Sequence, residues 1–130
     1  MADIINKELS YEITGIAYKI HNALGSIYSE KQYQDVFEET LKSKNLSNER
    51  EKDLYFRVGD TKIKGNRPDF IIENKIVVDL KVKKYITRED FRQMLRYLKS
   101  GEYKLGLIIN FGTPRVVIKR IVNSGLVRNS

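Results

Sequence analysis

The chain has 130 residues, of which 41% are hydrophobic and 32% charged, a balance that excludes a disordered chain and predicts one folded domain over residues 1–130. The 24 Lys+Arg residues outnumber the 17 Asp+Glu residues, and the net charge of +7 favours a polyanionic partner such as nucleic acid. The alternative is a basic protein with no such partner. With no cysteine and one histidine, the sequence excludes disulfides and cysteine or multi-histidine metal sites, so a metal would need oxygen ligands, as Mg²⁺, Mn²⁺ and Ca²⁺ do.

The N-terminus lacks a signal-peptide pattern, and no apolar run is long enough to span a membrane. We therefore expect no membrane association and a cytoplasmic location.

Two helices are predicted in the first third of the chain. Over residues 4–24, apolar side chains recur every three or four residues, which is typical of an amphipathic helix, and Gly25 is placed to end it. Ser29 and Gln32 have the spacing of a capping box for a second helix, with Glu30 in its first turn.

Four β-prone segments follow. Residues 54–58 and 61–65 flank Gly59-Asp60 and predict a hairpin, and residues 68–72 and 75–82 meet at a turn around Asn74. We expect these four strands to form a meander.

A third helix is expected from Thr87, whose capping partner would be Asp90, to Gly101. Residues 103–111 form an apolar run typical of a strand buried on both faces, residues 115–122 predict a last strand, and the tail, residues 123–130, is expected to fray. The order α-α-β-β-β-β-α-β-β predicts an α/β sandwich with a central mixed β-sheet flanked by helices.

Charged residues interrupt the fourth strand. Alternation places Asp79 and Lys81 on one face, and a hairpin centred on Asn74 would place Asp69 opposite Asp79. Facing like charges are destabilising unless they are compensated, and a divalent cation would compensate both. The alternative is an ordinary half-exposed strand with another register, in which Asp79 and Lys81 are solvated and Asp69 belongs to a turn.

These residues also match known motifs. Pro68-Asp69, nine intervening residues and Asp79-Leu80-Lys81 match the PD-(D/E)xK motif of a nuclease superfamily, and Gln93 with Tyr97 matches the QxxxY motif of its recombination-exonuclease branch. More specifically, the chain resembles the small bacterial group called GxxExxY proteins over nearly its whole length. The matching segments, in order, are "ITGIAYKIHNALG", "SEKQYQDVFEETL", "RPDFIIENKIVVDLK", "QMLRYLKSGEYKLGLIINFG" and "IKRIV".

Two positions differ from that family pattern. Ile27 stands where the glycine that names the GxxExxY motif would fall, and Asp79 stands where the family more often has glutamate.

The resemblance implies a restriction-endonuclease-like sandwich and a metal-dependent nuclease with Mg²⁺ or Mn²⁺ as cofactor. We expect its substrate to be DNA rather than RNA. The resemblance also implies a metal site made of Glu30, Asp69 and Asp79, and we expect the Leu80 carbonyl to be a further ligand. The catalytic residues that it implies are Asp69, Asp79, Lys81, Gln93 and Tyr97.

Basic residues around this site are candidates for binding the nucleic acid backbone. They are Arg67, Lys83 and Lys84 near the acidic strands, and Arg88, Arg92, Arg96 and Lys99 along one face of the third helix. The alternatives are a solvated outer helix face and, above all for Arg67, simple charge balance of Asp69 and Asp79.

Two readings of the whole chain stay open against the nuclease: a catalytically silent module with the nuclease fold that binds nucleic acid or a protein, and a plain structural domain. A chain with no separate DNA-binding domain favours the binding module or a homodimer. We expect His21 to pack or hydrogen-bond rather than to catalyse, and Tyr28, Tyr55 and Tyr103 to be core or rim residues rather than base-stacking platforms.

Overall fold

A computed structural model describes residues 5–128. In chain order the elements are α1 (Lys7–Leu24), α2 (Glu30–Ser43), β1 (Asn48–Arg50), β2 (Leu54–Val58), β3 (Thr61–Asn66), β4 (Phe70–Ile72), β5 (Ile76–Lys81), α3 (Arg88–Gly101), β6 (Leu105–Asn110), β7 (Val117–Val122) and α4 (Ser124–Arg128). Five strands form a mixed sheet in the order β1-β4-β5-β6-β7. Strands β5 and β6 are parallel, whereas the other neighbouring pairs of this sheet are antiparallel.

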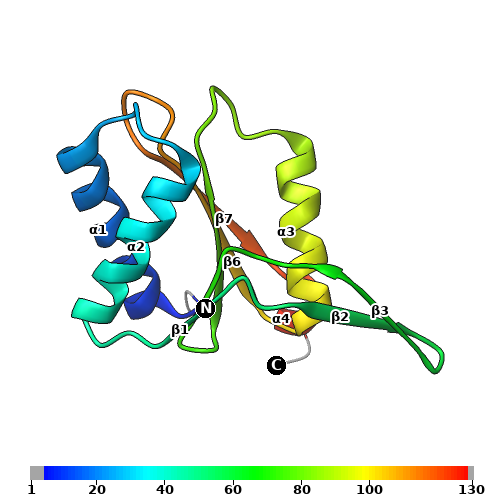
Figure 1. Cartoon of the computed structure of the whole chain (residues 1–130). Coiled ribbons are helices and arrows are strands. Elements are labelled where there is room, and N and C mark those ends of the chain that lie inside the picture. The colour runs from blue at the N-terminus through cyan, green and yellow to red at the C-terminus, as the bar shows by residue number, and fades with distance from the viewer. Residues whose placement is uncertain (1–4, 129–130) are drawn as a thin grey trace.

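Helices cover both faces of this sheet (Figure 1). On one face, Val78 and Leu80 of β5 pack in a core with Phe37 of α2 and with side chains of α1. On the other face, Val77 belongs to a second core with Met94 of α3. Alternation along β5 therefore divides its side chains between two layers, and the predicted mixed sheet flanked by helices is confirmed.

The ends of the helices follow the predicted signals. Ser29 Oγ accepts the Gln32 N–H at 3.2 Å, and Gln32 Oε1 accepts the Ser29 N–H at 2.9 Å, which completes the capping box of α2. Thr87 starts α3 in the same way, and Gly25, with φ of 71°, ends α1. Such a cap stabilises a helix by about 1 kcal/mol. Helix α1 begins at Lys7, and the predicted start at residue 4 lies outside the described residues.

The predicted four-stranded meander is wrong. Strands β2 and β3 form a separate two-stranded sheet, a ribbon that projects beside α3 (Figure 1). Pro68, which lacks a backbone N–H and cannot donate a ladder hydrogen bond, lies between the end of β3 and the start of β4. The neighbour of β4 is instead β1, an unpredicted edge strand whose Asn48 and Arg50 pair with Ile72 and Phe70.

The tail also differs from the prediction. Residues 124–128 form the short helix α4, although we expected them to fray. The preceding Asn123 is buried, and its side-chain amide donates to the carbonyl oxygens of Leu98 and Tyr103 at 3.4 and 3.3 Å. These bonds tie the start of α4 to the end of α3. Among residues 5–128, no helix combines the length and the apolar character that a membrane crossing requires.

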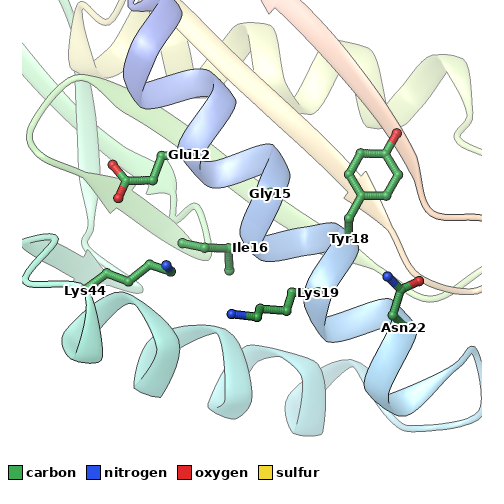
Figure 2. Close-up of a pocket in the computed structure, with 7 residues that line it drawn as sticks. All are labelled: Glu12, Gly15, Ile16, Tyr18, Lys19, Asn22 and Lys44. Atoms are coloured by element: carbon green, nitrogen blue, oxygen red, sulfur yellow. The ribbon is translucent and has the colours of Figure 1, made fainter.

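Two glycines differ sharply in the space around them. At Gly112, just past the end of β6, a Cβ atom would lie 2.4 Å from the Lys83 nitrogen and 2.6 Å from its carbonyl oxygen. Gly15 is exposed on α1, beside the groove shown in Figure 2, and a Cβ atom there would meet nothing within 4 Å. Close backbone contact therefore requires glycine at position 112 but not at position 15.

We expect Gly112→Ala to lower the free energy of unfolding by roughly 2 kcal/mol or more, because the backbone of Lys83 would have to move. The matched control Gly15→Ala should raise it by up to about 1 kcal/mol, since alanine is the better helix former. Urea unfolding of both variants measures the difference. Wild-type stability in Gly112→Ala would contradict the close contact.

Candidate active site

The β4–β5 hairpin has the predicted register. Ile72 pairs with Ile76 and Phe70 pairs with Val78, through a turn in which Glu73 and Asn74 have φ values of 54° and 52°. Strand β4 begins at Phe70, so residues 79–81 of β5 extend past it. The acidic residues lie at this step in the sheet.

Asp69 takes the place of a strand partner at that step. Continued by two residues, the register puts Pro68 opposite Leu80, and proline has no N–H to donate to the ladder. The Leu80 N–H donates to Asp69 Oδ2 at 2.8 Å, and the Asp69 N–H donates to Asp79 Oδ1 at 3.0 Å. The alternative with another register and a solvated Asp79 is therefore wrong, because Asp79 is only 4% exposed.

Burial raises the pKa of both carboxyl groups. For Asp79, burial and then the charge of Asp69 raise the pKa to about 7, although the Asp69 N–H and the charge of Lys81 act in the opposite direction. For Asp69, burial again raises the pKa, against hydrogen bonds from the Leu80 N–H and the Gln34 side chain. The two acids thus lie where a negative charge is costly.

Glu30 comes to the same region from the first turn of α2. The neighbouring Tyr33 fixes this turn, because its ring stacks on Phe111 with centroids 4.5 Å apart and its hydroxyl donates to the Gly25 carbonyl. Partial burial and then the charge of Asp69 raise the pKa of Glu30, against Lys81. The charges of the site therefore affect Glu30, although its side chain is solvent-exposed.

Within the described residues, no three acidic or histidine side chains are already gathered as metal ligands. The donor set nevertheless has the chemistry of a site for a hard cation, because it consists of carboxylates and the charge of Asp69 raises the pKa of both Asp79 and Glu30.

Lys81 lies among polar groups of β5 and α3. Its Nζ is 3.6 Å from Asp79 Oδ2 and 3.8 Å from Asp90 Oδ1, and it donates to Gln93 Oε1 at 3.1 Å. Tyr97 is 5% exposed, and burial followed by the charges of the two strand aspartates raises the pKa of its hydroxyl. The structure therefore brings the QxxxY side chains to the acidic site.

Sequence reasoning missed Asp90 as a site residue. It was assigned only as the capping partner of Thr87, but its Oδ2 also accepts from Lys83 Nζ at 2.9 Å. Burial raises the pKa of Asp90, whereas the hydrogen bonds from Lys83 and Thr87 outweigh this and leave it lowered. Its position three residues before Gln93, on the same helix face, was the available signal.

Gln34 and Arg50 were missed as well. Gln34 lies one helical turn after Glu30, which could have indicated its place, and it accepts from Arg50 at 3.2 Å. Arg50 belongs to the unpredicted strand β1, so no sequence signal pointed to it.

The basic residues predicted to bind nucleic acid fall into two groups, those with acidic partners and those that are exposed. Arg67 donates to Asp53 at 2.8 Å. Its contact is therefore with Asp53, and not with Asp69 or Asp79, whose charge we expected it to balance. Arg96 forms an ion pair with Glu89 at 3.2 Å. The remaining side chains of the helix face, with Lys84 before it, are exposed: Lys84, Arg88, Arg92 and Lys99.

The other predicted roles concern residues outside the acidic site. His21 Nε2 lies 2.9 Å from the Thr113 carbonyl and its ring stacks near Phe111, which confirms a packing and hydrogen-bonding role. Tyr28 and Tyr55 are 39% and 38% exposed, as rim residues are, and the Tyr103 hydroxyl donates to Asn74 Oδ1 at 2.8 Å.

Comparison with solved structures supports the class of fold. The crystal structure of SSO0001 superposes with a TM-score of 0.57 at 24% identity, covering 75% of this chain and 54% of that one. The chain thus spans about half the length of SSO0001. At this identity the likeness concerns the fold, which is an α/β fold of the restriction-endonuclease-like type.

Comparison of the sequence with protein families is more specific than the structural comparison. The sequence profile of the PD-(D/E)XK nuclease superfamily matches residues 7–121, and the chain belongs to this superfamily. The matched range includes all the candidate site residues. No curated protein sequence matches the chain.

We expect the metal-free protein to show the cost of ionising Asp79. Because its folded-state pKa is raised from 3.8 to about 7, the folded protein binds this proton more tightly than the unfolded chain does. The contribution to stability is complete below about pH 4 and is lost as the pH rises through about 7.

Asp79→Asn should therefore stabilise the protein in EDTA at about pH 8 by roughly 1 kcal/mol or more, and this gain should vanish towards pH 4. Chemical denaturation across this range measures it. Asp60→Asn, which removes an exposed carboxylate at the tip of the β2–β3 ribbon, is the control. A gain that does not depend on pH would contradict the burial argument.

Proposed function

We propose that this protein is a metal-dependent nuclease of the GxxExxY group that hydrolyses phosphodiester bonds, in DNA rather than RNA. The observation that carries the proposal is the step in the sheet, where the exchange of hydrogen bonds between Asp69, Asp79 and Leu80 places two carboxylates beside Lys81. Membership of the nuclease superfamily supports the class of reaction.

The proposed metal ligands are all oxygen atoms, as Mg²⁺ or Mn²⁺ would require. They are the carboxylates of Glu30, Asp69 and Asp79 and the carbonyl of Leu80. That carbonyl lies on the same side of β5 as the N–H that reaches Asp69, and Pro68 cannot supply the N–H that would otherwise pair with it. A bound divalent cation would supply Lewis-acid activation of water and would neutralise phosphate charge.

The neighbouring side chains would orient and stabilise the reacting groups. Lys81 Nζ lies 3.6 Å from Asp79 Oδ2, so it can position or deprotonate the attacking water and offset charge that develops on the phosphate. Gln93 holds Lys81 through a hydrogen bond of 3.1 Å, and Tyr97 closes the buried side of the site. A preorganised lysine loses little freedom in the transition state.

The basic residues are proposed to hold the nucleic acid backbone outside this centre. The exposed helix face of Arg88, Arg92 and Lys99 suits phosphate contacts, whereas Arg67 and Arg96 would have to leave acidic partners first. Lys83, bound to Asp90, would act close to the metal ligands. A single domain, a cytoplasmic location and a homodimer belong to the same proposal and stay predictions.

The second candidate is a nuclease-fold module that binds nucleic acid or a protein without cleaving it. One observation favours it: within residues 5–128, no three acidic or histidine side chains are gathered as metal ligands. Oxygen atoms of Asp69 and Asp79 already accept backbone N–H groups, so metal binding would have to use the remaining lone pairs or rearrange the site.

Cleavage assays distinguish the two candidates. With Mg²⁺ or Mn²⁺, we expect wild-type protein to cleave at least one of single-stranded, double-stranded or branched DNA, and Asp79→Ala and Lys81→Ala to lower the rate by roughly a hundredfold or more. Glu12→Ala and Lys19→Ala, which alter the groove of Figure 2 on α1, are the matched controls and should cleave like wild type. Equal cleavage by all variants would remove Asp79 and Lys81 from the mechanism.

Metal binding can be tested without substrate. Because a ligand that binds only the folded state stabilises it, Mn²⁺ at about a hundred times its dissociation constant should stabilise wild type by roughly 2.7 kcal/mol and raise its melting temperature. Asp69→Asn and Asp79→Asn should abolish this shift, Glu30→Gln should reduce it, and Glu12→Gln should leave it unchanged. A melting temperature of wild type that does not respond to Mn²⁺ would favour the binding module.

A further inference from the structure

The β2–β3 ribbon has two chemically different faces. Its register pairs Tyr55 with Lys64 and Arg57 with Lys62, and residues paired across an antiparallel ladder lie on the same face. The other pairs place Phe56, Ile63, Val58 and Thr61 together on the opposite face. One face of this exposed ribbon therefore carries three cations and a tyrosine, and the other face is mostly apolar.

Two of these cations are held in position. Lys62 Nζ lies 4.2 Å from the centroid of the Tyr55 ring, within the range of a cation–π contact. Lys64 Nζ lies 3.3 Å from Asp53 Oδ2. Lys62 is thus held beside an aromatic ring, whereas Lys64, like Arg67, would have to leave Asp53 before it contacts a phosphate.

The base of the ribbon lies close to the acidic site. Asn66, the last residue of β3, donates to Ser100 Oγ on α3 at 2.6 Å. Ser100 is two helical turns beyond Gln93 on the same face of α3, which corresponds to about 10 Å along the helix. Asp69 follows Asn66 by three residues, a reach of at most about 10 Å. From this base the ribbon extends away from the sheet (Figure 1).

The cationic face also continues onto α3. A surface pocket lies between β2 and the end of α3, and its lining includes Arg57 from the ribbon and Lys99 from the basic face of the helix. The pocket also includes Glu102, so its charge is not uniform. One cation of the ribbon, Arg57, and one of the helix face, Lys99, nevertheless lie together in this pocket.

We propose that the β2–β3 ribbon is an arm that holds double-stranded DNA beyond the bond to be cleaved, with Arg57, Lys62 and Lys64 against the phosphates. The major groove of B-DNA, about 12 Å wide, accommodates a two-stranded ribbon, and each cation that neutralises a phosphate releases counterions. This inference rests on the proposed nuclease function, because it assumes that the bond to be cleaved lies at Asp69. It deepens that function by assigning a duplex as the substrate.

The test compares DNA binding by three variants with wild type, in EDTA so that no cleavage occurs. The arm variant, Arg57→Gln/Lys62→Gln/Lys64→Gln, should bind a labelled duplex roughly tenfold more weakly in fluorescence anisotropy at about 0.1 M salt. Its plot of log affinity against log salt should have a slope smaller by roughly 2 to 3, since each lost phosphate contact removes about 0.9.

Two controls isolate the charges of the arm. Lys7→Gln/Lys19→Gln/Lys44→Gln removes the same charge from the α1–α2 side of the molecule, where Lys19 and Lys44 line the groove of Figure 2, and should keep duplex affinity within about twofold. Phe56→Ser/Val58→Ser alters the other face of the same ribbon, keeps all three cations and should also bind as wild type.

Duplex affinity and a salt slope of the arm variant equal to those of wild type would overturn the proposal, as would equal losses in all three variants. Because binding is measured without metal, the result does not depend on catalysis. A wild type that binds through the arm but never cleaves would contradict the nuclease and leave the arm as part of the binding module.

Discussion

The site depends on one interruption of the sheet: Pro68 cannot continue the β4–β5 ladder. Strand β5 extends beyond its neighbour, and the Asp69 side chain, rather than a strand carbonyl, accepts the Leu80 N–H. The exchange is reciprocal, since the Asp69 N–H donates to Asp79. The Pro-Asp pair of the motif thus has a structural reason: proline offers no N–H to the Leu80 carbonyl, and the aspartate side chain accepts the Leu80 N–H.

This arrangement buries two carboxyl groups at the end of the sheet, where charge is not needed to form the fold. Burial raises the pKa of Asp69 and Asp79, and the charge of Asp69 adds to that effect at Asp79 and at Glu30. The lysine on the same strand only partly offsets it, because Lys81 is shared between Asp79, Asp90 and Gln93. Apolar side chains would make a more stable sheet end, so these residues are better explained by chemistry than by stability.

Sequence predicted the features that local patterns determine. The turn around Asn74 and the alternation of β5 predicted Asp69 opposite Asp79, with another register left open, and capping residues located the starts of α2 and α3. Long-range pairing was not accessible: the three polar residues Asn48–Arg50 form a strand only because β4 offers an open edge. The β2–β3 hairpin was recognisable from its turn, but no local signal shows which sheet a hairpin joins.

The unpredicted edge strand β1 is connected to the acidic site through the side chains of Arg50 and Gln34. Arg50 of β1 bonds Asp35 and Glu38 at 2.8 and 3.0 Å and so ties α2 to the sheet edge. It also donates to Gln34 Oε1, which leaves the amide N–H₂ of Gln34 for Asp69, where its hydrogen bond lowers the pKa. A strand of three residues thereby opposes the effect of burial on the pKa of Asp69, because it fixes the orientation of the Gln34 amide.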